Sequence, residues 1–170
     1  MMTRALILGY GNPLRGDDAL GVLAAERLRA LLPEAEVLTS HQLTPELAAV
    51  LSQSDAAVFL DAAALGTPGT VSVTRLAPHP SAASLTHQVS PQALLELAQS
   101  LYGHAPRAYL ITGVGESFSP QAPPAASHEP ETSTSSSEEL DAELTPAAAA
   151  ALEKICRLVP ELLAHFPALW

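Results

Sequence analysis

The sequence contains little cysteine, few aromatic residues and few cations. Its single cysteine, Cys156, excludes an internal disulfide and a cysteine-rich metal site. Because Cys156 lies in an apolar run, we expect a buried, unreactive thiol. Eight Lys and Arg against 18 Asp and Glu give a formal charge of −10, which disfavours nucleic acid or an anionic membrane as a partner. A basic peptide or a cation suits this charge better.

Long hydrophobic runs are also absent. No segment approaches the roughly 18 apolar residues that a membrane span needs, and the first residues carry no signal-peptide cleavage pattern. We therefore expect a cytoplasmic protein that does not enter a membrane. Hydrophobic residues nevertheless make up 48% of the chain, chiefly Ala and Leu. This predicts a single domain over residues 1–170 with an aliphatic core.

Short apolar runs typical of strands alternate with longer segments of helical spacing. Strands are expected at 5–10, 35–41, 56–63, 70–77 and 107–115, and helices at 19–32, from Thr44 and Pro45 onward, at 90–103 and from about 146 to 165. This alternation predicts an α/β fold with three α/β/α layers and a mostly parallel sheet of about five strands. Residues 70–77 alternate apolar and polar side chains, which indicates an edge strand.

Residues 119–144 differ from the rest of the chain. They are rich in Pro, Ser, Thr and Glu and have almost no apolar side chains. Such a segment cannot bury enough surface to offset the entropy lost on ordering, so we expect a disordered insertion.

Polar residues that could carry chemistry follow the predicted strands. Asp17 and Asp18 follow the first strand, Asp61 ends the third, and His87 precedes the helix at 90–103. Ligands of parallel sheets bind beyond the carboxyl ends of the strands, so Asp17 or Asp18, Asp61 and His87 can converge there. Two carboxylates and an imidazole suit a borderline divalent ion such as Ni²⁺ or Zn²⁺ in an open site.

Each of these residues also has a purely structural interpretation. One of Asp17 and Asp18 can cap the following helix, and we expect Asp17 to turn toward the backbone amides of that helix. Asp61 can bind loop amides, and His87 can be a surface residue. The Gly9-x-Gly11 turn also resembles the start of a dinucleotide fingerprint, but the third glycine is missing and two carboxylates stand where phosphate would bind, so NAD and FAD are disfavoured.

Three segments together resemble the hydrogenase maturation proteases. The segment ILGYGNPLRGDDALGV is similar to the family's opening motif, VFLDAA to its strand ending in Asp-Ala, and LTHQVSPQALLELA to its Thr-His segment before a Leu-rich helix. The matching positions of the first motif are Gly9, Gly11, Asn12, Asp17, Asp18 and Gly21, and the other two motifs contribute Asp61 and His87. The resemblance covers roughly residues 4–115 and the last helix.

The resemblance implies an aspartyl-type endopeptidase that removes the C-terminal extension of a nickel-loaded hydrogenase large-subunit precursor. The nickel would arrive with the substrate and bind Asp18, Asp61 and His87, and zinc or cadmium could substitute for it in crystals. Candidate substrate-binding residues near these ligands are Gly11, Asn12, Asp17 and His41. The protein would act as a monomer. A nickel-binding checkpoint protein of hydrogenase assembly, without peptidase activity, would use the same three ligands and stays open as the alternative.

Overall fold

The computed structural model describes residues 4–79, 89–120 and 143–166, which fold around one five-stranded sheet. The strands are β1 (Ala5–Tyr10), β2 (Glu36–Ser40), β3 (Ala56–Ala63), β4 (Val71–Leu76) and β5 (Arg107–Val114). They lie in the order β2-β1-β3-β5-β4. All pairings are parallel except that of β4 with β5. The predicted α/β class, strand number and edge position of β4 are therefore confirmed.

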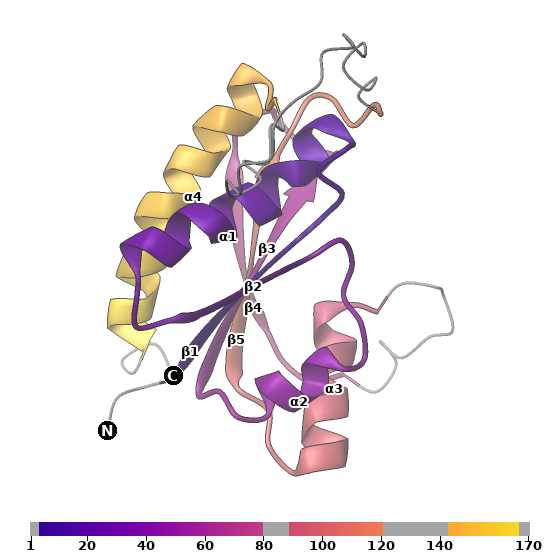
Figure 1. The fold of residues 1–170 in the computed structure, drawn as a ribbon, viewed down its shortest axis with the longest axis vertical. Coiled ribbons are helices and arrows are strands. Elements are labelled where there is room, and N and C mark those ends of the chain that lie inside the picture. The colour runs from indigo at the N-terminus through magenta and orange to yellow at the C-terminus, as the bar shows by residue number, and fades with distance from the viewer. Residues whose placement is uncertain (1–3, 80–88, 121–142, 167–170) are drawn as a thin grey trace, which may run out of the picture.

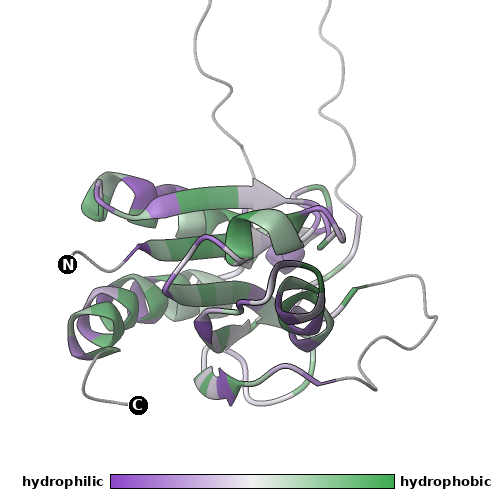
Figure 2. Cartoon of the chain, turned by 90° about the horizontal axis from the view of Figure 1, so that it is seen from below, coloured by the Kyte–Doolittle hydropathy of each residue, from purple (hydrophilic) through white to green (hydrophobic). Residues whose placement is uncertain are grey.

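Helices cover both faces of this sheet. Helices α1 (Leu20–Leu31) and α4 (Pro146–His165) pack on one face, and α2 (Leu47–Leu51) and α3 (Pro91–Tyr102) on the other (Figure 1). Each face has its own core, because successive side chains of a strand point to opposite faces. The central strands are apolar on both faces, as expected for buried parallel strands, and Figure 2 shows them as largely hydrophobic ribbons between the two helical layers.

Helix α1 packs unusually close to the sheet at its first turn. A Cβ atom on Gly21 would lie 2.4 Å from the carbonyl oxygen of Leu60 and 2.7 Å from that of Tyr10, and a Cβ atom on Gly9 would lie 2.2 Å from the carbonyl oxygen of Gly21. Any side chain at these two positions would push the helix off the strands. The glycines therefore fix how the segment before α1, the 3-10 helix η1 (Gly16–Ala19), sits over the strand ends.

Two helices start as the sequence predicts. The Ser90 hydroxyl accepts a hydrogen bond from the Ala93 amide at 3.1 Å, and the Thr145 hydroxyl accepts one from the Ala148 amide at 3.3 Å. A proline follows each cap, where its missing N–H costs nothing. Helix α3 ends at Gly103, whose φ of 75° is a conformation that glycine adopts easily.

The start of α2 was predicted wrongly. The helix begins at Leu47 and carries no side-chain cap, whereas the sequence placed its cap at Thr44. The amides of Leu47 and Ala48 instead bind the carbonyls of Thr44 and Pro45, at 3.1 Å each. These bonds form a tight turn of the i to i+3 type ahead of the helix.

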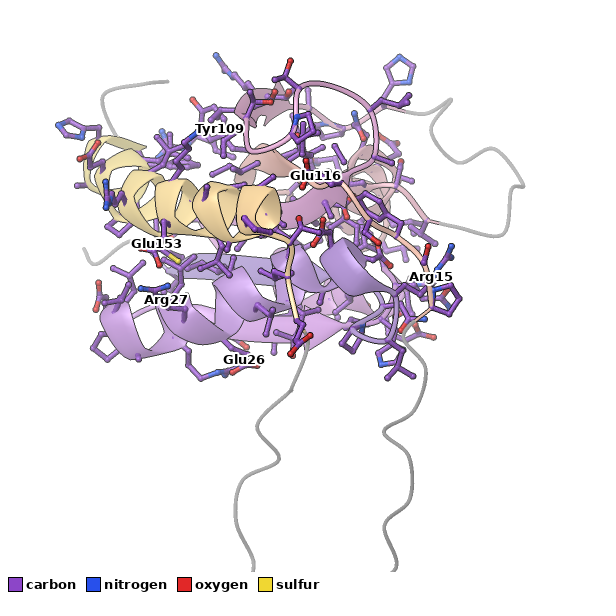
Figure 3. All side chains as sticks on the ribbon, turned by 90° about the horizontal axis from the view of Figure 1, so that it is seen from above. Arg15, Glu26, Arg27, Tyr109, Glu116 and Glu153 are labelled. Carbon is purple, nitrogen blue, oxygen red and sulfur yellow. The ribbon has the colours of Figure 1, made fainter. Side chains whose placement is uncertain are left out.

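Cys156 is buried, as predicted, and this burial raises the pKa of its thiol, as expected of an unreactive cysteine. A half-exposed ion pair joins Arg27 of α1 to Glu153 of α4 (Figure 3), and at such exposure it adds little stability. No helix in the described ranges is long and apolar enough to cross a membrane. Most of the insertion, residues 121–142, lies outside the described residues, so its predicted disorder stays a prediction.

Candidate functional site

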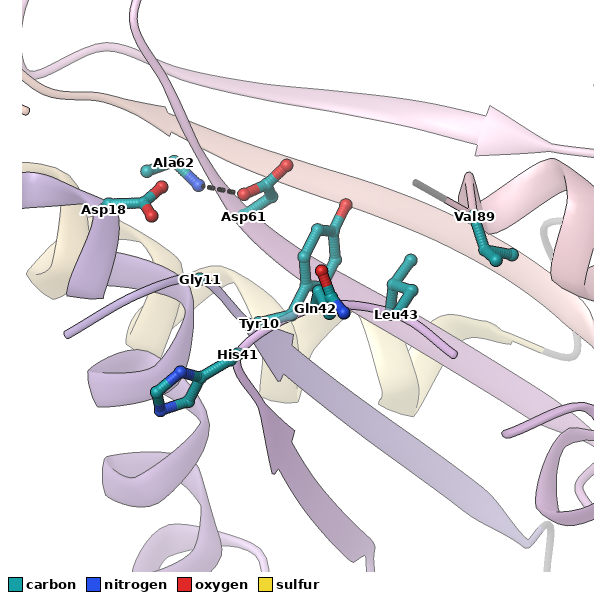
Figure 4. Close-up of a pocket in the computed structure, with 9 residues that line it drawn as sticks. All are labelled: Tyr10, Gly11, Asp18, His41, Gln42, Leu43, Asp61, Ala62 and Val89. Carbon is teal, nitrogen blue, oxygen red and sulfur yellow. Dashed lines mark hydrogen bonds between the residues drawn. The ribbon is translucent and has the colours of Figure 1, made fainter. Parts of the chain in front are cut away.

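A pocket of about 230 Å³ opens at the carboxyl edge of the sheet. It lies where β1, β2 and β3 end and where the chain enters α3, which is the edge at which parallel sheets bind ligands. Its lining combines carboxylates, an imidazole and an apolar wall, and consists of Tyr10, Gly11, Asp18, His41, Gln42, Leu43, Asp61, Ala62 and Val89 (Figure 4).

Asp18 reaches the pocket from η1 and is held by the loop after β1. The backbone amide of Asn12 donates a hydrogen bond to Oδ2 of Asp18 at 2.8 Å. Gly11 allows this loop to close, because its φ is 141° and a Cβ atom there would lie 2.0 Å from the Asp18 carbonyl oxygen. The Gly11-Asn12 dipeptide therefore shapes the turn that presents the Asp18 carboxylate.

Asp61 reaches the same pocket from the end of β3. Its Oδ1 accepts a hydrogen bond from the Ala62 amide at 2.8 Å. Burial raises the pKa of the Asp61 carboxyl to about 6, and the nearby charge of Asp18 acts in the same direction. The hydrogen bond from the Ala62 amide and the nearby Tyr10 hydroxyl offset only part of this rise. The site therefore holds two carboxylates that repel each other, one of them poorly solvated.

Asp17 lies elsewhere, and its predicted turn toward the amides of α1 is wrong. Its side chain is fully buried and its carboxylate accepts four hydrogen bonds, from the amides of Glu116, Ser117 and Thr145 and from the Thr145 hydroxyl, at 2.7–3.1 Å. Burial alone would raise the pKa of this carboxyl, but these bonds hold it below its usual value. Neither η1 nor α1 has a side-chain cap, so the expectation that one of the two aspartates caps the helix fails as well.

The physical reason lies in the path of the chain. The Asp17 amide donates to the Ser117 carbonyl at 2.8 Å, and a Cβ atom on Gly115 would lie 2.5 Å from the Cβ atom of Asp17. Both backbone and side chain of Asp17 are thus drawn under the end of β5. The carboxylate joins η1 to the chain after β5 and to the first residue before α4, and it is engaged inside the protein rather than in the pocket.

Of the remaining candidate residues, some line the pocket and others do not. Gly11 and His41 line the pocket, and Asn12 binds Asp18 through its amide. Figure 4 shows the His41 ring turned away from the two carboxylates. His87 lies outside the described residues. Within the described ranges, no group of three or more His, Cys, Asp or Glu side chains is arranged to hold a metal ion.

The sequence analysis did not name five of the lining residues: Tyr10, Gln42, Leu43, Ala62 and Val89. Tyr10 ends β1 directly beside the strand that carries Asp61, a pairing that no single segment of the sequence encodes. Gln42 and Leu43 follow β2, whose carboxyl end lies at the same edge. Val89 lies just before α3, which begins at the same edge.

The solved structures with this architecture decide what the chain resembles. HycI of Thermococcus kodakarensis KOD1, a NiFe-hydrogenase maturation protease, matches 95% of this chain and 93% of its own with a TM-score of 0.68 at 24% identity. The hydrogenase maturating endopeptidase HybD of E. coli matches 97% and 93% with a TM-score of 0.64 at 26% identity. The resemblance to the hydrogenase maturation proteases is confirmed.

Another maturation protease agrees over nearly its full length. The hydrogenase 2 maturation peptidase of a Thaumarchaeota archaeon matches 95% of this chain and 98% of its own, with a TM-score of 0.64 at 26% identity. No protein-family model and no curated protein sequence matches the chain. The likeness to the maturation proteases is therefore carried by the three-dimensional structure together with the short motifs.

Proposed function

We propose that this protein is an endopeptidase that removes the C-terminal extension of a nickel-loaded NiFe-hydrogenase large-subunit precursor. The observation that carries this function is the pairing of Asp18 and Asp61 in one open pocket of a fold shared with the maturation endopeptidases. The similarity to maturation endopeptidases over nearly the whole chain supports this activity. We further propose that the protein acts as a monomer in the cytoplasm.

The chemistry of the pocket favours a cation as the group that it recognises. Asp18 and Asp61 contribute two carboxylates, and no ion pair joins either of them to a Lys or Arg within the described residues. The raised pKa of Asp61 means that its ionised form is disfavoured in the empty pocket. A divalent ion would reverse this, because it favours both ionised carboxylates at once. Carboxylate and imidazole donors fit Ni²⁺ or Zn²⁺.

His87 is the proposed third ligand. Val89, two residues further along the chain, lines the pocket. His41 is the other imidazole near the pocket, but its ring faces away from the carboxylates. The nearness of His87 to Val89 in the sequence and the orientation of His41 therefore both favour His87.

The nickel belongs to the substrate in this mechanism. The two carboxylates and the imidazole would bind the precursor through its metal and so place the precursor's tail across the pocket mouth. A metal held there can polarise the scissile carbonyl or activate a water molecule. The nine lining residues include no Ser, Thr, Cys or Lys that could act as a nucleophile, which agrees with direct hydrolysis rather than a covalent intermediate.

The test is to incubate a nickel-loaded large-subunit precursor with each variant and to measure its intact mass. His87→Ala and Asp61→Asn should abolish processing while circular dichroism shows the wild-type fold and neither variant melts below the wild type. His165→Ala is the matched control, because His165 is an exposed histidine at the far end of α4. Full processing by both pocket variants would contradict the metal-recognition mechanism. Nickel-dependent precursor binding without cleavage by the wild type would favour the checkpoint protein instead.

A further inference from the structure

The 3-10 helix η1 carries both aspartates of the first motif, and their side chains point in opposite directions. The Asp18 carboxylate lines the pocket and points toward Ala62 and Asp61 (Figure 4). Asp17 is fully buried and lies under the end of β5. Consecutive Cα atoms are about 3.8 Å apart, so whatever holds the backbone of Asp17 also holds the backbone that carries Asp18.

Little within η1 itself fixes the place of Asp18. The element has only four residues and no side-chain cap, and 3-10 helices have poorer hydrogen-bond geometry than α-helices. The Asp18 carboxylate accepts a hydrogen bond from the Asn12 amide, and the Asp18 amide donates to the Arg15 carbonyl at 3.2 Å. Both partners belong to the loop that leads into η1, so these bonds tie Asp18 to nearby residues of the same segment.

Asp17 supplies hydrogen bonds between η1 and distant parts of the chain. Its Oδ2 accepts from the amides of Glu116 at 2.7 Å and Ser117 at 3.1 Å, just after β5. Its two carboxylate oxygens also accept from the Thr145 amide at 2.8 Å and the Thr145 hydroxyl at 2.7 Å. One side chain thus joins η1 to the end of β5 and to the start of α4.

The backbone of η1 lies directly against the chain after β5. A Cβ atom on Gly16 would lie 2.6 Å from the Ser117 carbonyl oxygen, and one on Gly115 would lie 2.5 Å from the Cβ atom of Asp17. The Asp17 amide donates to the same Ser117 carbonyl at 2.8 Å. Because both glycines keep side chains out of this contact, the two segments are held together chiefly by the hydrogen bonds of Asp17.

A metal site is sensitive to small displacements of such an element. Ligands have to be held within about 0.5 Å of their productive positions, and η1 carries one of the two carboxylates of the pocket. We propose that Asp17 is a positioning residue, whose carboxylate clamps η1 against the end of β5 and thereby holds Asp18 opposite Asp61. The inference rests on the proposed function in that the cation shared by Asp18 and Asp61 is the precursor's nickel. Asp17 itself does not line the pocket and does not touch the metal.

The test uses Asp17→Asn in the full-length protein. The amide keeps the size of the side chain but replaces one acceptor oxygen by an NH₂ group, which cannot accept from the donors around it. Ni²⁺ alone is titrated into each protein by calorimetry, under conditions in which circular dichroism shows that the protein is folded. Asp17→Asn should weaken Ni²⁺ binding by about 10-fold or more, as the loss of an outer group that orients a metal ligand does.

Val159→Ala separates positioning from stability. Val159 is buried in α4, about 20 Å along the helix from Thr145, so its truncation leaves a destabilising cavity far from η1. This variant should bind Ni²⁺ as the wild type does. Equal weakening in Val159→Ala and Asp17→Asn would show that affinity only follows stability, and it would overturn the inference.

Thr145 gives a second series that does not depend on the folding of Asp17→Asn. Thr145→Val removes the hydroxyl that donates to Asp17, whereas Thr145→Ser keeps it. Ser90→Ala is the matched control, because it removes the same kind of cap from α3 on the other face of the sheet. Ni²⁺ binding should weaken in Thr145→Val and stay at the wild-type level in Thr145→Ser and Ser90→Ala. Unchanged binding in Asp17→Asn, or in Thr145→Val where Asp17→Asn does not fold, overturns the inference.

Crystal structures of the wild type and of the variant that weakens binding give a readout that does not need the metal. In Asp17→Asn or Thr145→Val, Asp18 should move away from Asp61 or occupy more than one position. An unmoved Asp18 overturns the inference. If the wild type neither binds Ni²⁺ nor processes the precursor, the proposed function fails, and the position of Asp18 alone then decides the role of Asp17.

Discussion

Asp17 and Asp18 are adjacent in sequence and occupy opposite environments. Asp17 is fully buried and its carboxylate is saturated by four donors of the protein, which lower its pKa. Asp18 faces a pocket, beside an Asp61 whose pKa is raised to about 6. Asp17 is thus satisfied by the fold, whereas each pocket carboxylate accepts one backbone hydrogen bond and has acceptor capacity left for the proposed cation. The number of donors around a carboxylate, and not its burial alone, separates these two environments.

Removing the Asp17 carboxylate should have the largest effect on stability. Asp17→Ala leaves the part-buried amides of Glu116, Ser117 and Thr145 without their acceptor, and each unsatisfied group costs about 1–3 kcal/mol. We expect the free energy of unfolding in urea to fall by at least about 3 kcal/mol. A fall below about 1 kcal/mol would mean that water replaces the carboxylate as the acceptor of these amides, and that solvent reaches the space around Asp17.

A comparison of two helix caps isolates the contribution of the hydrogen bond between Thr145 and Asp17 to stability. Ser90 and Thr145 both cap a helix and both precede proline, but only Thr145 also donates its hydroxyl to Asp17, at 2.7 Å. Ser90→Ala should cost about 1 kcal/mol, as a lost cap does. Thr145→Ala should cost about 1.5 kcal/mol more, because a hydrogen bond to a charged group is lost as well. Equal losses in chemical denaturation would show that the bond to Asp17 adds nothing.

Neutralising the pocket should act in the opposite direction. Because the folded-state pKa of Asp61 is raised above its unfolded value, its ionisation destabilises the metal-free protein as pH rises from about 4 through 6. Asp61→Asn should therefore stabilise that protein at pH 7 by about 1–2 kcal/mol, after allowance for partial solvent exposure. The gain should shrink below pH 6 and vanish below about pH 4. Thermal unfolding of Asp61→Asn and the wild type across this pH range measures the gain in stability. A destabilised Asp61→Asn at pH 7 would contradict the repulsion between the Asp18 and Asp61 carboxylates.

The smallest effect should come from the insertion. Replacing about 20 of residues 121–142 by a short Gly/Ser linker keeps the described flanks that bind Asp17 and removes almost no apolar area. The entropy of closing a loop changes only with the logarithm of its length. We expect a melting temperature within a few degrees of the full chain by calorimetry. A large loss would mean that this segment packs on the core, contrary to its composition.

Local patterns predicted most of the fold, because they depend on residues close in sequence. Apolar runs placed the strands, and Ser90-Pro91 and Thr145-Pro146 placed two helix starts. Position at strand ends predicted that Asp61 meets Asp17 or Asp18, the family resemblance selected Asp18, and the structure places Asp18 and Asp61 in one pocket. The role of Asp17 was missed because its partners lie 99 to 128 residues away. Tyr10 was missed because its place beside Asp61 depends on the pairing of two strands, which no single segment encodes.

The first motif contains two kinds of residue. Gly9 and Gly21 are needed for packing, because a Cβ atom on Gly21 would clash with the carbonyls of Leu60 and Tyr10, and a Cβ atom on Gly9 would clash with that of Gly21. Asp18 contributes a carboxylate to the pocket, and in the proposed function it binds the nickel of the precursor. On that proposal, a related chain that kept both glycines and replaced the carboxylate would preserve the architecture and lose the hydrolytic activity. Genome-wide assignment of this activity should therefore weigh the acidic position of the motif above its glycines.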